Sequence, residues 1–257
     1  MENIYLVSLG SVLGAIFGSF FNAIAIRTVE NRPWWGRERS LCPICDHELS
    51  SLDLIPLVSW LALKGRCRHC KGQISLRYPL VELLFALWTG AALARWGATF
   101  GGLGAVLGGW LMMLNAMTDL DSGYVYDKLA ATIGIVGIAI RFFGGLPAVL
   151  DGVYGALAGG GVIAVIIVIS RGGMGWGDAT LMAGAGVLLG WKTAFLASYL
   201  GFMIGGTVAL AMIATKKAGR KDSVPLAPFL AAGVMIALIW GPYILDFWYY
   251  TPGWPWS

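Results

Sequence analysis

The chain has 257 residues, of which 58% are hydrophobic and only 12% are charged. Soluble domains carry about 25% charged residues, so this chain has about half the usual supply. The composition excludes a soluble globular domain, a disordered chain and a disulfide-stapled secreted module. It predicts an all-α polytopic membrane protein that contacts membrane lipid, and the net charge of +4 gives no reason to expect a nucleic-acid partner.

The first apolar segment covers residues 4–26 and contains no charged residue. It is long enough to cross a bilayer core of about 30 Å. It is too long for the apolar region of a signal peptide, and the residues before it include no basic cluster. We therefore expect a retained first transmembrane helix, which makes up the first of three regions, residues 1–26.

The second region, residues 27–79, is polar and contains all four cysteines and both histidines. The third region, residues 80–257, contains further apolar spans at 80–96, 100–118, 129–143, 152–170, 179–190, 193–215 and 226–247. With the first helix, the sequence predicts about eight transmembrane helices. The segment 179–190 is short, so it forms a half-span or begins further back, near Gly172.

Lys and Arg are distributed unequally between the predicted loops. If the second region is cytoplasmic and the chain then alternates sides, 15 of the 18 Lys and Arg residues fall on the cytoplasmic side, among them Lys217, Arg220 and Lys221. Cytoplasmic loops of membrane proteins carry an excess of Lys and Arg. The distribution therefore predicts that the N-terminus lies outside and the polar loop lies inside.

The four cysteines form two CxxC pairs, Cys42 with Cys45 and Cys67 with Cys70. Four thiolates in paired CxxC segments can close tetrahedrally on zinc, and the cytoplasm keeps thiols reduced. We predict a structural zinc site with these four ligands. A redox dithiol pair and cysteines without metal are the alternatives. The two histidines, one beside each pair, are expected to be solvated or to support the ligands.

Carboxylates at membrane depth are costly and suggest function. Asp119 and Asp121 follow the predicted third helix, Asp127 comes soon after, and Asp178 ends a Gly-Trp-Gly-Asp sequence. Two crossings separate these clusters, so both reach the cytoplasmic membrane face. Two carboxylates there can act on a water molecule as base and acid, whereas each alone is typical of a helix cap. The glycines beside Asp178 are expected to allow unusual backbone angles and the close approach of a substrate strand.

Two other acidic residues receive structural interpretations. Asp151 falls in a predicted outer connection and is expected to be a solvated loop residue. Glu82 lies near the start of the predicted second helix, where it reaches the headgroup layer or pairs with Arg77. The sequence contains no HExxH motif, and because both histidines belong to the cysteine region, no Ser/His/Asp triad is evident.

These features together resemble the type IV prepilin peptidase family over nearly the whole chain. The matching motifs are GSFFN at 18–22 followed by Arg27, CPxC at 42–45, GRCRHC at 65–70, ISxRYPLVE at 74–82, DLD at 119–121, GxGD at 175–178 and VPxAPF at 224–229. The chain departs from the family pattern at Tyr126, where Pro is usual, and at Thr180, where Lys is usual.

The resemblance implies a membrane aspartic endopeptidase with Asp119 and Asp178 as its catalytic pair. Asp127 is the alternative to Asp119, because Tyr126-Asp127 resembles the YD sequence of presenilin-type GxGD proteases. The implied substrates are prepilins or type II secretion pseudopilins, which lose a short basic leader at the cytoplasmic face of the bacterial inner membrane. The resemblance also implies that S-adenosylmethionine then methylates the new N-terminus, although no GxGxxG motif after a strand marks a donor site.

Two functions of other classes remain open at this point. One is an ion-coupled transporter in which Asp119, Asp178 and Arg141 line a conduction path. The other is a membrane scaffold whose zinc loop has no catalytic role.

Overall fold

The computed structural model describes residues 2–34, 39–171, 174–216 and 224–256. Within these ranges the regular secondary structure is helical apart from two isolated β-bridges, which confirms the all-α class. The chain divides into two compact units, residues 1–94 and residues 95–257.

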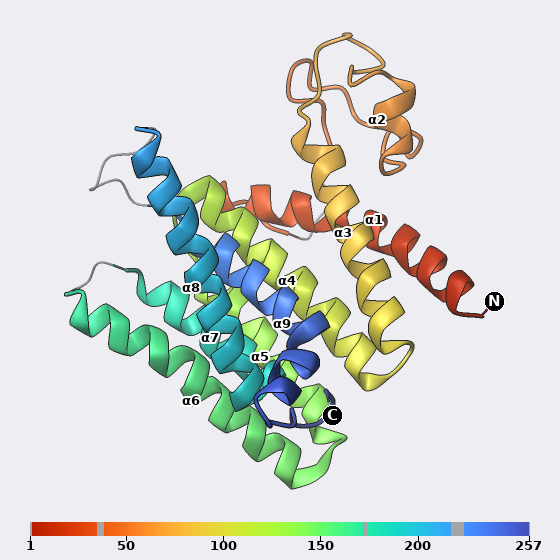
Figure 1. The fold of residues 1–257 in the computed structure, drawn as a ribbon. Coiled ribbons are helices and arrows are strands. Elements are labelled where there is room, and N and C mark those ends of the chain that lie inside the picture. The colour runs from red at the N-terminus through yellow and green to blue at the C-terminus, as the bar shows by residue number, and fades with distance from the viewer. Residues whose placement is uncertain (1, 35–38, 172–173, 217–223, 257) are drawn as a thin grey trace. The chain divides into compact units, whose positions relative to one another are not determined.

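Unit 1 consists of two long helices and the cysteine region between them (Figure 1). Its helices are α1 (Glu2–Val29), the short α2 (Val58–Ala62) and α3 (Arg77–Trp96), which enters the second unit at Arg95. Glycines let α1 pack closely on α3, as small residues do in membrane helices. A methyl group at Gly14 would lie 2.6 Å from the carbonyl oxygen of Phe85, and one at Gly18 would lie 3.0 Å from Cα of Glu82.

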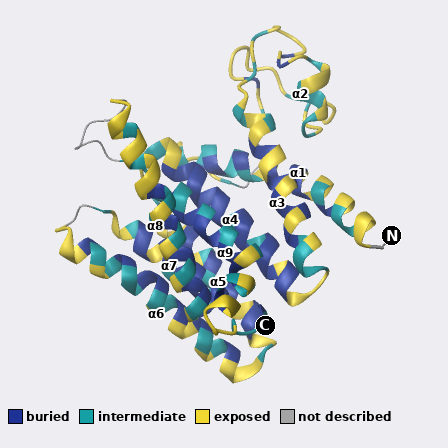
Figure 2. Cartoon of the chain, in the orientation of Figure 1, coloured by how far each residue is buried: buried dark blue, intermediate teal, exposed yellow. Residues whose placement is uncertain are grey.

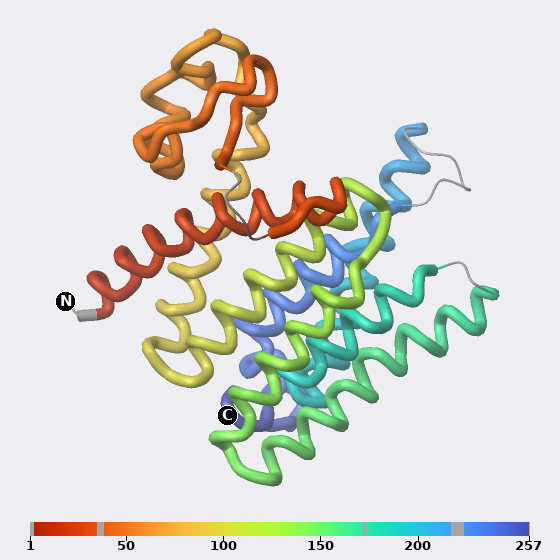
Figure 3. Tube along the Cα trace, turned by 180° about the vertical axis from the view of Figure 1, so that it is seen from behind, coloured from red at the N-terminus to blue at the C-terminus, as the bar shows by residue number. Residues whose placement is uncertain are grey.

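Unit 2 is a bundle built from the end of α3 and six further helices: α4 (Phe100–Ser122), α5 (Asp127–Phe142), α6 (Gly145–Ile169), α7 (Trp176–Leu189), α8 (Trp191–Ala214) and α9 (Ala227–Phe247). Helix α7 packs against α5 and α6, and α9 packs against α4 and α8 (Figures 1 and 3). The interior of the bundle lies along α4, α7 and α9, where Met112, Leu181 and Leu238 are fully buried (Figure 2).

All eight predicted apolar segments are helical, and α2 is an additional short helix that the sequence analysis did not predict. Five helices among the described residues, α1, α4, α6, α8 and α9, are long and apolar enough to cross a membrane. Eight membrane crossings therefore remain a prediction. Helix α7 begins at Trp176 and has 14 residues. The alternative start near Gly172 lies outside the described residues, as do Lys217, Arg220 and Lys221.

A buried ion pair joins α5 and α6. The fully buried Arg141 donates from Nη1 to Oδ2 of Asp151 at 2.9 Å and to the carbonyl oxygen of Ala148 at 2.8 Å. The interpretation of Asp151 as a solvated loop residue is therefore wrong. The reason is that α6 begins at Gly145, ahead of its predicted start, so that Asp151 lies in the second turn of the helix and faces α5.

The Arg141→Met substitution tests this pair, because it keeps an apolar side chain but leaves Asp151 without its cation. Removing one partner of a buried pair is strongly destabilising, so we expect the free energy of unfolding to fall by about 3 kcal/mol. The measurement is denaturant unfolding of the purified protein in detergent. The control is Lys192→Met, since the contacts of Lys192 lie at the surface: it donates to the exposed carbonyl of Thr251 and lies over the exposed rings of Trp191 and Tyr250. It should change stability by less than about 0.5 kcal/mol. An equally small effect of Arg141→Met would contradict this account.

Candidate active site and metal centre

Asp119 lies in the last turn of α4, which ends at Gly123 in the left-handed conformation with φ 70°. The residue is only 5% exposed. Its Oδ2 accepts a hydrogen bond from the backbone N–H of Ala227, the first residue of α9, at 3.0 Å. The first N–H groups of a helix have no partner within the helix and carry partial positive charge. The N-terminus of α9 therefore holds and stabilises the Asp119 carboxylate.

Asp178 lies in the first turn of α7 and is 8% exposed. Helix α7 contacts α4, and Gly177, the residue before Asp178, lies against Val125 in the segment that follows Asp119. The structure therefore brings together the two carboxylates that the sequence analysis paired. Asp121 and Asp127, in contrast, are exposed.

Gly177 accounts for the close approach of the two aspartate motifs. A methyl group at Gly177 would lie 2.8 Å from Cβ of Val125 and 3.1 Å from the Val125 carbonyl oxygen. Carbon atoms in contact prefer separations of about 3.5–4.0 Å, so only glycine fits without displacement. The sequence analysis assigned this space to a substrate strand, but the chain's own segment between Asp119 and Asp127 fills it. The expected unusual backbone is also absent at Gly175, whose φ of −76° is ordinary.

Asp127 occupies a different environment from the buried pair. It is the first residue of α5, and its Oδ1 accepts a hydrogen bond from the Thr180 hydroxyl at 2.8 Å. This contact ties the start of α5 to the first turn of α7. The sequence analysis did not foresee it, because it treated Thr180 only as a replacement for a charged residue.

Arg141 lies far from the aspartates along α5. It is 14 residues after Asp127, which corresponds to about 20 Å at 1.5 Å per residue. Its guanidinium is engaged by Asp151, Ala148 and the carbonyl oxygen of Leu188. Arg141 therefore serves the packing of α5 on α6 and α7 at the other end of α5 from Asp127.

The four cysteines meet at one point in unit 1. Their Sγ atoms lie within 4.8 Å of one another, and Cys42 and Cys70 are 3.9 Å apart. Tetrahedral zinc, with Zn–S bonds of about 2.3 Å, separates its sulfur ligands by about 3.8 Å. A disulfide would require about 2.05 Å, and all four cysteines are free thiols. The backbone N–H groups of Ile44 and Cys45 hold the pKa of the Cys42 thiol down at about 7, which favours the thiolate that a metal binds. The cluster therefore fits a four-thiolate metal site.

The two CxxC segments share one backbone design. The N–H of Cys42 donates to the His47 carbonyl at 3.0 Å, and the N–H of Cys67 donates to the Gly72 carbonyl at 2.8 Å. The residue after the second cysteine has a positive φ in both, 53° in the first segment and 59° in the second. The histidine rings of the two segments stack with centroids 3.7 Å apart. These repeated turns aim both cysteine pairs at the same point.

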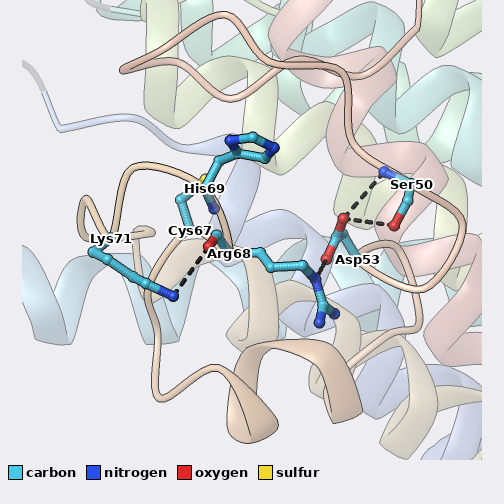
Figure 4. Close-up of polar contacts among 6 residues, drawn as sticks. All are labelled: Ser50, Asp53, Cys67, Arg68, His69 and Lys71. Carbon is cyan, nitrogen blue, oxygen red and sulfur yellow. Dashed lines mark hydrogen bonds and ion pairs between the residues drawn. The ribbon is translucent and has the colours of Figure 1, made fainter.

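An ion pair joins the turn at 50–53 to the second CxxC segment (Figure 4). Asp53 accepts hydrogen bonds from the hydroxyl and the N–H of Ser50 at 2.6 and 3.1 Å, and Nε of Arg68 donates to it at 2.8 Å. Ser50 and Arg68 together lower the pKa of Asp53 to about 2. The sequence analysis missed this contact, because nothing in the spacing of Asp53 and Arg68 marks them as partners.

Apolar helices, two buried aspartates at adjoining helix ends and a four-cysteine cluster define the class: a helical membrane protein with an aspartate pair. Comparison with known proteins identifies the family within this class. Residues 12–96 match the Bacterial Peptidase A24 N-terminal domain, and residues 105–210 match the Type IV leader peptidase family. The chain belongs to the type IV leader peptidase family.

Similar proteins are named prepilin leader peptidase/N-methyltransferase. The protein of Aeromonas hydrophila is 37% identical over 218 residues, which cover 83% of this chain and 75% of that protein. The Stutzerimonas stutzeri protein is 32% identical over 91% of this chain and 90% of its own length. For the Bacillus subtilis (strain 168) protein the identity is 32%, over 94% of this chain and 97% of its own. No solved structure matches the chain significantly. The comparisons confirm the resemblance seen in the sequence.

The Gly177→Ala substitution tests the close approach of the two motifs. The added methyl group collides with Val125, and overpacking of this kind costs about 1–3 kcal/mol. We expect this loss in the free energy of unfolding, measured in detergent. Gly161→Ala in α6 is the matched control, because a methyl group there meets nothing within 4 Å. The control should be neutral or slightly stabilising, since alanine favours helices. Equal stability of the two variants would show that Val125 does not restrict Gly177.

Proposed function

We propose that Asp119 and Asp178 are the catalytic pair with which this chain removes the leaders of prepilins or pseudopilins. The chain is a leader peptidase and N-methyltransferase, since it carries both family domains and matches relatives with that name over most of their length. The observation that carries the residue assignment is the burial of the two carboxylates at adjoining ends of α4 and α7. Asp127 is exposed and accepts a hydrogen bond from Thr180, so it is the weaker candidate for the catalytic carboxylate.

A water molecule held between the two carboxylates would be the nucleophile. The ionised carboxylate takes a proton from the water as its oxygen attacks the scissile carbonyl, and the protonated carboxyl donates to the carbonyl oxygen. The Ala227 N–H stabilises negative charge on Asp119, so we assign Asp119 as the base and Asp178 as the acid. Because the two groups titrate as a coupled pair, the two roles exchange when the proton moves between them.

The reaction is assigned to the cytoplasmic face of the bacterial inner membrane. The excess of Lys and Arg in the predicted cytoplasmic loops supports this orientation, with the N-terminus outside. The five apolar helices support an integral membrane protein, and the family supports prepilin substrates with a basic leader and an apolar stem. The comparisons give no support to an ion-coupled transporter.

We assign one structural zinc ion to Cys42, Cys45, Cys67 and Cys70. A four-thiolate site has no open coordination position, so the metal would order the surrounding loop rather than activate water. S-adenosylmethionine is the expected methyl donor.

We expect Asp119→Asn and Asp178→Asn each to reduce the rate of leader cleavage by at least about 1000-fold. The two carboxylates act together, so the loss of either one removes most of their joint contribution to the rate. Cleavage of a purified prepilin in detergent, followed by mass spectrometry, is the measurement. Asp127→Asn is the control and should retain measurable cleavage, since the amide oxygen of Asn can still accept the Thr180 hydrogen bond. If Asp127→Asn is inactive and Asp119→Asn is active, the catalytic base is Asp127 and the assignment of Asp119 is wrong.

The metal site predicts about one zinc per chain in the purified protein. The Cys42→Ser plus Cys45→Ser variant should lose the metal and make the loop sensitive to protease, because metal binding and folding of such a loop are coupled. It should also impair methylation more than cleavage. Asp53→Asn is the control, since it disturbs the same loop but keeps all four thiolates and should keep the zinc. Native protein without zinc by metal analysis would rule out the site.

A further inference from the structure

A buried carboxylate in unit 1 has no role in the chemistry described so far. Glu82, in the second turn of α3, is 7% exposed. It accepts a hydrogen bond from the backbone N–H of Leu57 at 2.7 Å and one from the Ser19 hydroxyl. The expected pairing with Arg77 does not form, because Nε of Arg77 donates to Oδ1 of Asn22 instead. Among the described residues, Glu82 therefore has neutral donors and no ion pair.

A second unsatisfied group lies one helical turn away on α1. Asn22 is 1% exposed, and its Nδ2 has no hydrogen-bond partner. It follows Ser19 by three residues, so both side chains lie on the same face of α1. A buried donor without a partner destabilises the fold, and a buried charge without a counter-ion destabilises it more. Two such groups in neighbouring turns indicate a place for a ligand that is both cationic and able to accept a hydrogen bond.

The loop residue above the carboxylate is strained. Leu57 has a φ of 61°, in the left-handed region that non-glycine residues rarely adopt. Its N–H is the one that donates to Glu82. Strained residues of this kind persist where the surroundings hold them, and they concentrate at functional sites.

We propose that Glu82 and Asn22 form the amine subsite for methyl transfer: Glu82 binds the N-terminal ammonium group of the processed pilin and removes one proton from it, and Asn22 donates to the first carbonyl oxygen of that chain. This inference rests on the methyltransferase activity stated under the proposed function. The ligand class is a peptide with a free, protonated α-amine.

The reaction balances without any redox partner. The ammonium group gives one proton to the Glu82 carboxylate and becomes a neutral amine. The amine lone pair then attacks the methyl carbon of a sulfonium donor, so that a C–N bond forms and the S–CH3 bond breaks, with its electron pair remaining on sulfur. The products are a methylated ammonium and a neutral thioether, and Glu82 returns its proton to solvent. Because both reactants are cations at neutral pH, an unpaired carboxylate is the group that this step needs.

Among the residues that the structure describes in unit 1, the groups near Glu82 are mostly neutral. Helix α1 presents the neutral Ser19 and Asn22 to it, and the loop presents the backbone of Leu57. Arg77 lies one turn before Glu82 on α3 and is bound to Asn22, while Nη1 of Arg27 donates to the Trp34 carbonyl at 3.2 Å. None of these groups accepts a proton near neutral pH, so Glu82 is the base in this cluster.

The test is methylation of a processed pilin peptide with a free N-terminus by the full-length protein in detergent, with S-adenosylmethionine in excess. At about pH 7, Glu82→Gln should slow methylation at least about 100-fold, as expected for loss of a general base. Cleavage of prepilin should stay within about threefold of the native rate. A free N-terminal amine has a pKa of about 8 and loses its proton unaided at higher pH. The defect should therefore shrink about tenfold between pH 7 and pH 9.

Two further variants serve as controls. Ser19→Ala removes a donor to Glu82 but keeps the carboxylate, so methylation should fall only a few-fold. If Glu82→Gln does not fold, Glu82→Asp replaces it, and this variant should keep the native dependence of methylation on pH. A defect that is equal at both pH values would overturn the amine subsite, as would parallel loss of cleavage and methylation in Glu82→Gln. If the native protein cleaves prepilin but never methylates it, the methyltransferase activity is contradicted. That outcome is seen in the native protein alone, so it is distinguishable from a failure of the Glu82 proposal.

Discussion

The contact between Val125 and Gly177 is the constraint on which the aspartate pair depends. Asp119 ends α4, the chain passes through Val125, and α7 begins directly against this segment. Apolar surroundings make each buried carboxylate expensive, so the pair must be held by few but well-placed donors. The N-terminus of α9 supplies one of them to Asp119. Three helix ends thus meet at one polar site, apart from the Arg141–Asp151 ion pair between α5 and α6.

The residues that we propose for the two activities lie in different units of this chain. The aspartate pair lies in unit 2, whereas the cysteine cluster and Glu82 lie in unit 1. Each unit has its own family match, residues 105–210 for one and 12–96 for the other. Peptide hydrolysis requires two carboxylates and a water, whereas methyl transfer requires a neutral amine in line with its donor. The residues suited to each reaction are therefore separate in the fold as they are in the sequence.

Much of the fold and of the candidate site follows from composition and spacing. Apolar runs predicted the eight long helices, because lipid-facing and core positions both favour apolar residues. The cysteine cluster followed from two CxxC pairs. Counting crossings predicted that the acidic cluster at 119–127 and Asp178 reach the same membrane face, and the family resemblance selected Asp119 from that cluster. These features are visible because they depend on local pattern, which a sequence displays directly.

Contacts that depend on exact helix ends were not predictable. Asp151 was misplaced because the start of α6 was set several residues too late. The donor from Ala227 and the approach of Val125 to Gly177 join segments far apart in the chain, and no periodicity marks them. Glu82 was expected to reach the headgroup layer or to pair with Arg77, yet it is buried, and Arg77 bonds to Asn22 across the helix contact. Each of these misses concerns a tertiary contact whose partner has no signature of its own.

The central claim is that Asp119 and Asp178 hold the attacking water between them. The most direct measurement is a structure of the full-length protein bound to a prepilin peptide in which a hydroxyl-bearing carbon replaces the scissile carbonyl. That hydroxyl stands in for the tetrahedral intermediate. The account predicts that it lies within about 2.5–3.0 Å of an oxygen of both Asp119 and Asp178. A hydroxyl bound instead to Asp127, with Asp119 still on the Ala227 N–H and out of reach, would contradict it.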